Sequence, residues 1–235
     1  MTDKLESRAA LYSALAFSFA YPDSGADFTL ILSEVENAVA LAEQAKGSHD
    51  ASALRAGIHN LRLAIQNLQS AEFSPAEEYT FLFHRHALCP PYESSYSLAG
   101  MEQSLADIAG FHRAFGVQMS PEAHERVDHI GSELEFMAVL CAKEAHAFRN
   151  ALTEQAEICR SARAAFLTDH LGAWTLMFAA RVQEKARLLL YPALTGLLAS
   201  LLALDAEDLG ALLTSARGEP VPSMGTDNPE ELSCD

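Results

Sequence analysis

The chain has 235 residues, of which 49% are hydrophobic, so it is long and apolar enough to bury a sizeable core. Its 32 acidic and 16 basic residues give a formal charge of -16, which opposes binding to nucleic acid or anionic lipid and favours a basic partner. The four cysteines are widely spaced and predict neither a disulfide framework nor a paired-cysteine motif, which indicates a reducing cytosol.

Two apolar stretches resemble membrane-directed segments. The first, residues 9–20, follows a mixture of acidic and basic residues instead of the basic region of a cleaved signal peptide. The second, residues 188–204, is at the short limit for a membrane span and is interrupted by Pro192 and Gly196. We expect the second stretch to be a buried core helix, with no stable membrane insertion.

Strand patterns are nearly absent, whereas residues that favour helix are abundant, so we expect an all-α fold. The clearest helix carries apolar residues at spacings of four and three from Leu54 to Leu68, which is one buried stripe. Caps, prolines and periodicity predict about ten helices. The first helix should begin near Asp3 and end before Pro22, and the fourth should begin at Pro75. The others are expected over residues 27–46, 54–68, 101–115, 120–148, 153–166, 168–190, 191–204 and 206–216.

The loop that follows the fourth helix is the most informative segment. Ser74, Pro75 and Glu77 predict the capped start of that helix, which should carry Tyr79 and Phe83 on one face. The two prolines in the segment from Cys89 to Tyr96 are incompatible with regular helix. Its aromatic residues either form an apolar groove for a peptide, with a charge from Glu93, or simply pack the loop onto the bundle.

A second cluster is expected in the middle of the helix over 120–148. There His129 and Glu133 would stand one turn apart on the same face, beside Asp128 and Glu135. This arrangement is compatible with a metal, with acid–base chemistry or with a partner's arginine, whose planar fork matches carboxylates. The simpler alternative is a solvated His–Glu ion pair.

His84, His86 and Cys89 are the nearest approach to a zinc-binding set, and surface histidines in a loop are the alternative. Glycine-rich phosphate-binding motifs and a GxSxG elbow are missing from the sequence. Cys141 and Cys159 stand in helical, apolar settings typical of core cysteines. These observations favour a binding protein over an enzyme.

Three segments together resemble the TorD/DmsD/NarJ family of redox-enzyme maturation chaperones. The first runs from Glu78 to Phe83 and continues into Pro90-Pro91-Tyr92-Glu93-Ser94-Ser95-Tyr96, and is similar to the family's EYxxLF and PPYxSxY-like pattern. The second, residues 128–137, is similar to its DHxxxELxFM stretch, and the third, residues 166–174, to FLxxHLxxW. The residues of the first segment resemble those found in the branch of the family that serves periplasmic enzymes of the dimethyl sulfoxide reductase class. One departure is Val127, where relatives often carry proline, so the helix there is expected to be continuous.

The resemblance implies one compact TorD-like helical domain, which we place over residues 1–216. Residues 217–235 are rich in proline, glycine and acidic residues, so their composition predicts a flexible tail, which is a second departure from the family. It implies a cytoplasmic chaperone, monomeric or homodimeric, without a cofactor of its own, that binds the N-terminal, twin-arginine-type leader of a molybdenum-cofactor oxidoreductase and assists folding, cofactor insertion and export proofreading. The leader-binding residues carried over are Tyr79, Phe83, Pro91, Tyr92, Glu93, Tyr96, Asp128, His129 and Glu133. A metal-dependent helical enzyme and an adaptor that binds a folded subunit through the tail are the alternatives, and the client's identity stays open.

Overall fold

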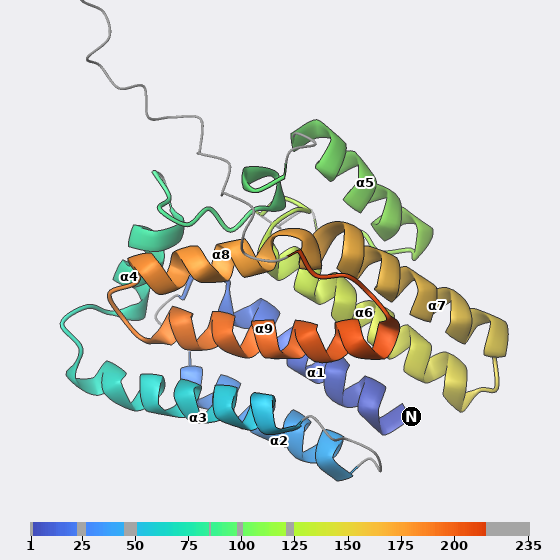
Figure 1. The fold of residues 1–235 in the computed structure, drawn as a ribbon, viewed down its shortest axis with the longest axis horizontal. Coiled ribbons are helices and arrows are strands. Elements are labelled where there is room, and N and C mark those ends of the chain that lie inside the picture. The colour runs from blue at the N-terminus through green and yellow to red at the C-terminus, as the bar shows by residue number, and fades with distance from the viewer. Residues whose placement is uncertain are drawn as a thin grey trace, which may run out of the picture.

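The structure is a computed structural model that describes residues 2–22, 27–44, 51–84, 86–97, 101–120 and 125–214. These residues form nine α-helices and no strand beyond one isolated β-bridge, which confirms the all-α prediction (Figure 1). The α-helices are α1 (Thr2–Ser18), α2 (Phe28–Gln44), α3 (Ala51–Asn67), α4 (Pro75–Phe83), α5 (Met101–Ala114), α6 (Ile130–Arg149), α7 (Thr153–Phe166), α8 (Gly172–Lys185) and α9 (Leu190–Leu209). Three short segments join them: 3-10 turns η1 (Leu68–Ser70) and η2 (Glu93–Ser95), and the π-helical η3 (Leu167–Leu171).

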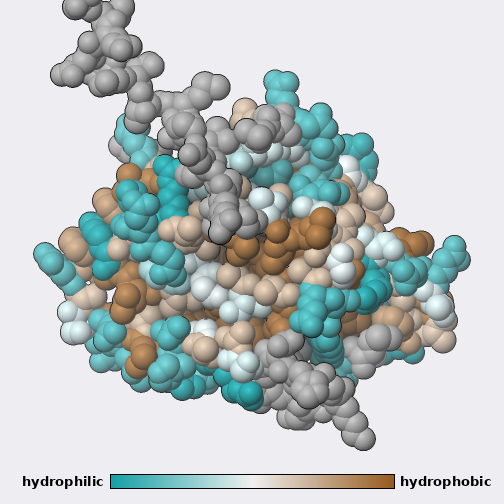
Figure 2. Space-filling view, viewed as in Figure 1, coloured by the Kyte–Doolittle hydropathy of each residue, from teal (hydrophilic) through white to brown (hydrophobic). Residues whose placement is uncertain are grey.

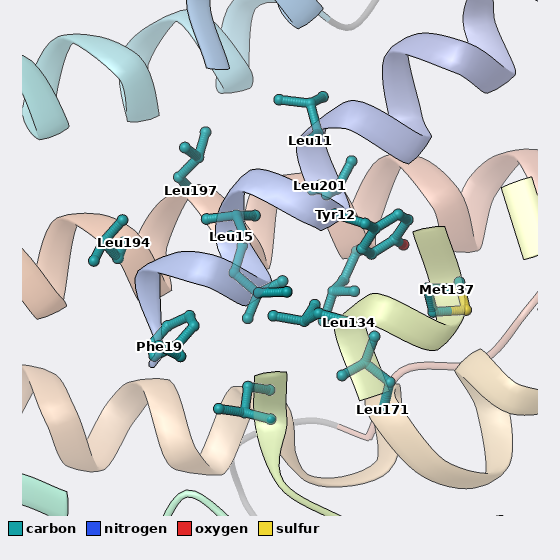
Figure 3. Packing of buried hydrophobic residues seen from close by; sticks show 14 of the residues in the cluster. Leu11, Tyr12, Leu15, Phe19, Leu134, Met137, Leu171, Leu194, Leu197 and Leu201 are labelled. Carbon is teal, nitrogen blue, oxygen red and sulfur yellow. The ribbon is translucent and has the colours of Figure 1, made fainter. Parts of the chain in front are cut away.

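The core lies where α1 packs along α6, with α2, α3 and α9 on one side and α7 and α8 on the other. Figure 3 shows side chains of α1, α6 and α9 converging there, among them Leu15, Leu134 and Leu197. The buried apolar cluster of which this interior is part extends to the other helices as well, and burial of its side chains from water stabilises the fold. In Figure 1, α5 lies at the edge of the molecule.

Helix α9 is apolar because it is a core helix. By length and composition alone it could cross a membrane, but 56% of its most apolar window is buried inside the protein. It packs against α3 so closely that a Cβ on Gly57 would lie 2.9 Å from Leu197 Cδ1 and 3.2 Å from its Cα. Leu54, Ile58 and Leu61 of the predicted stripe are buried, whereas Ile65 and Leu68 are partly buried. After α9 the chain turns back, and Thr214 N donates to Gly172 O. Figure 2 shows apolar residues gathered near the middle of the face shared by α7, α8 and α9.

A buried network of charged groups ties four helices together. Arg163 of α7 donates to Glu144 of α6 (2.7 Å) and to both carboxylate oxygens of Asp205 of α9 (3.0 Å each). Asp205 also accepts from the Tyr12 hydroxyl (2.7 Å) and pairs with Arg8, both on α1. We call Arg8, Glu144, Arg163 and Asp205 the core network. Its two arginines and two carboxylates balance in charge.

The capped start of α4 is confirmed. Ser74 Oγ accepts from Glu77 N (3.2 Å), and the Glu77 carboxylate accepts from Ser74 N (2.7 Å). This reciprocal pair satisfies two backbone donors at the helix start. The capping box therefore fixes where α4 begins and, with it, where the following loop leaves the bundle.

The prediction of one continuous helix over 120–148 is wrong. Helix α6 begins at Ile130, and His129 is its N-cap in an extended conformation (φ -74°, ψ 141°). The start is set by contacts with a distant loop, because Ile130 N donates to Pro91 O across 2.9 Å. Residues 125–129 are not helical, so Asp128 and His129 do not lie in the middle of a helix. Residues 121–124, where the helix start was expected, lie outside the described residues.

The helix boundaries after residue 166 also differ from those predicted. The expected start of a helix at Thr168 is absorbed in η3, which joins α7 directly to α8. Helix α8 ends at Lys185, not near residue 190, because the backbone N–H groups of Arg187 and Leu188 donate to the Glu78 carboxylate (2.6 and 3.1 Å). The prediction of a separate helix over 206–216 is wrong for the described residues 206–214. Helix α9 continues to Leu209 and ends at the left-handed Gly210 (φ 67°). The tail over 217–235 lies outside the described residues.

Candidate functional site

The aromatic loop and the start of α6 are joined backbone to backbone. Glu93 N donates to Asp128 O (2.9 Å), Ile130 N donates to Pro91 O (2.9 Å), and Tyr92 and His129 form an antiparallel bridge. We call residues 91–96 and 125–133 together the junction. The first two of the three sequence motifs therefore meet, as the resemblance implies.

Asp128 holds the junction together and is fully buried. Its carboxylate accepts two hydrogen bonds from the guanidinium of Arg126 (2.9 Å each) and one from Ser94 N (3.3 Å). Arg126 also donates to Ser94 Oγ (2.8 Å), and its guanidinium lies 4.4 Å from the centre of the Tyr92 ring. Asp128 is thus occupied by an arginine of its own chain, a pairing that the sequence reasoning missed although the two residues are neighbours.

His129 is buried beneath Tyr92, with 5.3 Å between the ring centres. Its Nδ1 accepts from Gly131 N (3.1 Å), and its Nε2 has no hydrogen-bond partner among the described residues. Burial lowers the pKa of His129, so the imidazole is held neutral with its proton on Nε2. Because Nδ1 turns toward Gly131, His129 does not form the expected side-chain pair with Glu133.

Glu133 is also fully buried, on the first turn of α6. Its Oε2 accepts from Trp174 Nε1 (3.1 Å), and its Oε1 has no hydrogen-bond partner among the described residues. Burial, and next the neighbouring Glu93 carboxylate, raise the pKa of Glu133 well above its usual value of 4.5. The solvated ion pair considered for His129 and Glu133 is therefore wrong, since both side chains are shielded from water.

Glu93 connects the junction to the third motif. Its Oε2 lies 3.0 Å from Nδ1 of His170, which η3 presents, and the His170 ring packs against Phe111 and Phe166. The π-helical turn η3 brings His170 to Glu93, and the first turn of α8 brings Trp174 to Glu133. Neither His170 nor Trp174 was among the predicted site residues, although the FLxxHLxxW resemblance contains both.

The predicted aromatic residues form a second group that packs the loop onto the bundle. Tyr79, Phe83 and Tyr96 each expose 5% or less of their surface. The Tyr96 ring stacks on Trp174 (5.4 Å, 27°), and the Phe83 ring lies 4.9 Å from that of Tyr191. Pro91 is buried as well, and Tyr92 is partly exposed, with its hydroxyl donating to Glu125 (2.5 Å). These rings have little surface to offer a partner, apart from that of Tyr92.

A pocket of about 590 Å³ opens beside the junction, between α5 and η3. Glu93 and His170 line it together with polar and apolar residues of α5. A larger, mostly apolar pocket of about 730 Å³ lies elsewhere, between the ends of α1 and α3 and the starts of α2 and α4. Only the smaller pocket touches a predicted site residue, namely Glu93.

The proposed zinc ligands do not come together. His84 and His86 are exposed, whereas Cys89 is buried. In the part of the chain that the structure describes, no three His, Cys, Asp or Glu side chains are grouped as a metal site requires. Burial raises the pKa of Cys89 to about 12 and also raises that of Cys141, so these thiols are poor nucleophiles.

These features define an all-α, TorD-like domain whose motif segments meet in a buried, acid-rich junction. Residues 48–180, more than half of the chain, match the family model described as nitrate reductase delta subunit, and the protein belongs to that family.

Three similar proteins are named as reductase assembly chaperones. The selenate reductase assembly chaperone protein of Thauera selenatis is 37% identical over 84 residues, and the chlorate reductase assembly chaperone protein of Ideonella dechloratans is 34% identical over 84 residues. Each alignment covers 36% of this chain and 42% of the relative, so the chain matches less than half the length of these two relatives. The perchlorate reductase assembly chaperone protein of Dechloromonas aromatica (strain RCB) is 26% identical over 204 residues, which cover 83% of this chain and 86% of that protein.

Proposed function

We propose that this chain is an assembly chaperone for the catalytic subunit of a molybdenum-cofactor oxidoreductase. It binds the N-terminal leader of that subunit in the cytoplasm, holds the subunit for folding and cofactor insertion, and delays export until both are complete. Its contribution is binding, without covalent chemistry of its own. The family and the names of the three relatives support this assignment.

One structural observation carries the leader-binding part of the proposal. The three motif segments converge on Glu93, which also lines an open pocket. An acidic pocket beside a rigid loop suits a basic and apolar peptide, and the formal charge of -16 favours its approach. Because the leader is ordered on binding, its affinity is expected to be moderate and its release easy.

Co-expression with a reductase catalytic subunit tests the proposal. The complete subunit should elute with the chaperone in size-exclusion chromatography, whereas a subunit without its leader should elute alone. The molybdenum content of the subunit, measured by elemental analysis, should fall when the chaperone is omitted. Equal complex formation with and without the leader would remove the leader-binding proposal, and an unchanged molybdenum content would remove the role in assembly.

A further inference from the structure

The pocket between α5 and η3 has a shape that suits a peptide side chain. We call it the α5 pocket. Its volume of about 590 Å³ falls within the usual range of ligand pockets. It is lined by Glu93, Ser97, Ser104, Ala106, Asp107, Gly110, Phe111, Ala114, Phe115, Asp169 and His170. Its position beside Glu93 connects it directly to the junction.

Helix α5 gives the pocket one wall with two parallel rows of side chains. Ala106, Gly110 and Ala114 recur every four residues, which places small side chains in one row along the helix. The adjacent row is Asp107, Phe111 and Phe115, which combines one charge with two rings. A Cβ added to Gly110 would meet no atom within 4 Å, so the space above the small row is open.

The charge of the lining is one-sided. Asp107 and Asp169 are exposed, while Glu93 is buried beside His170. None of the described residues that line the pocket is a lysine or an arginine. Asp107 accepts from the neutral amide of Gln103 (2.7 Å) and Glu93 lies 3.0 Å from His170, whereas the Asp128 carboxylate is occupied by the guanidinium of Arg126.

We propose that the α5 pocket holds an arginine side chain of the client leader between Asp107, Asp169 and Glu93, with the apolar residue next to it packed on Phe111 and Phe115. This inference rests on the proposed function and locates its binding site. A guanidinium fits because its planar fork donates to several carboxylate oxygens at once and its flat face packs on aromatic rings. The pocket, and not the buried rings of the junction, makes the contact with the partner.

Binding of a labelled synthetic peptide, measured by fluorescence anisotropy, tests the inference. The probe carries two adjacent arginines followed by apolar residues, and a second probe has glutamine in place of both arginines. The first probe should bind and the second should bind at least about tenfold more weakly. The affinity of the first should fall as salt is added, since exposed charges are screened.

Filling the pocket should block the peptide without harming the fold. Gly110→Leu places a side chain in open space and favours helix, and we expect the affinity to fall by about tenfold or more. Gly196→Leu is the matched control, because Gly196 is an exposed glycine of α9 at which an added Cβ also meets nothing within 4 Å. Its affinity should stay within about twofold of that of the unchanged protein.

Removing the charges of the two exposed carboxylates gives a second test, which does not change the volume of the pocket. Asp107→Asn with Asp169→Asn should weaken binding by about threefold to tenfold and make it less sensitive to salt. Glu154→Gln with Glu157→Gln changes the net charge equally at exposed positions of α7 and should leave the affinity nearly unchanged. Equal binding by all four variants, or equal binding of both probes, would overturn the inference.

The failure of the inference can be told apart from that of the proposed function. If the reductase subunit still binds through its leader and Gly110→Leu has no effect on that complex, the α5 pocket is the wrong site and the chaperone assignment stands. If the unchanged protein binds neither the first probe nor the subunit, the inference and the proposed function both fail.

Discussion

Two buried groups of charged side chains stabilise different parts of this molecule, and they are composed differently. The core network balances two arginines against two carboxylates deep between α1, α6, α7 and α9. The junction holds Glu93, Asp128 and Glu133 against one partly exposed arginine, Arg126. Among the described residues, the core network leaves one buried atom, Arg163 Nε, without a hydrogen-bond partner, whereas the junction keeps an excess of acid and leaves three, Tyr96 Oη, His129 Nε2 and Glu133 Oε1. The core network therefore balances its charge within the chain, whereas one carboxylate of the junction, Glu93, also lines the α5 pocket.

The largest effect should come from breaking the core network. Asp205→Ala removes the acceptor shared by Arg8, Tyr12 and Arg163 and leaves buried charge unpaired. We expect the free energy of unfolding to fall by about 3–5 kcal/mol, measured by urea denaturation. Glu36→Ala is the control, since Glu36 pairs only with the exposed Arg62 in the described contacts (side chains 38% and 48% exposed), and should cost less than about 1 kcal/mol. Similar losses for the two variants would contradict the structural role of the network.

A smaller effect on stability, with a local effect on the loop, is expected at the junction. Asp128→Ala leaves Arg126 and Ser94 N without their acceptor, but Arg126 can turn to water. The loss should be about 1–3 kcal/mol, and amide hydrogen exchange should accelerate over residues 91–96. Glu135→Ala, at an exposed position of α6, should do neither. If amide exchange over residues 91–96 is unchanged in Asp128→Ala, the Asp128 carboxylate does not stabilise this loop.

The smallest effect in acid, below pH 4.5, is expected for Glu133→Gln, and the effect grows as the pH rises. Because the folded-state pKa of Glu133 is raised, the protonated acid contributes stability that is complete below pH 4.5 and is lost as the pH rises through the folded-state pKa. Glutamine cannot ionise. As the pH rises above 4.5, the free energy of unfolding of the variant should therefore increase relative to that of the unchanged protein, by at most about 1.4 kcal/mol per pH unit. Urea denaturation at a series of pH values measures this, and a constant difference between the two proteins would contradict the raised pKa.

The sequence predicted those parts of the fold that depend on neighbours in the chain. The stripe of α3 and the Ser74–Glu77 capping box follow from spacing alone. The start of α6 could not be found in this way, because Pro91 and Ser94, more than thirty residues earlier, determine it through hydrogen bonds to Ile130 and Asp128. Helix α8 ends early for the same kind of reason, a contact with the distant Glu78.

For the candidate site, the sequence indicated which segments meet but not how their side chains are arranged. Resemblance indicated that the loop around Glu93 and the Asp128–His129 pair belong together, and they meet. Spacing could not show that Arg126 occupies Asp128, because helical periodicity was assumed where the backbone is extended. The α5 pocket depends on how α5 lies against η3, and no local pattern encodes that contact.

Hydrogen exchange of the protein with and without the two-arginine peptide tests the central claim most directly. We predict slower exchange on binding at residues 93–97 and along α5, with no change in α1 or α9, where the core network lies. Gly110→Leu should show none of this protection. Protection confined to α1, α4 or α9, or an unchanged pattern at saturating peptide, would contradict the proposal that the α5 pocket is the binding surface.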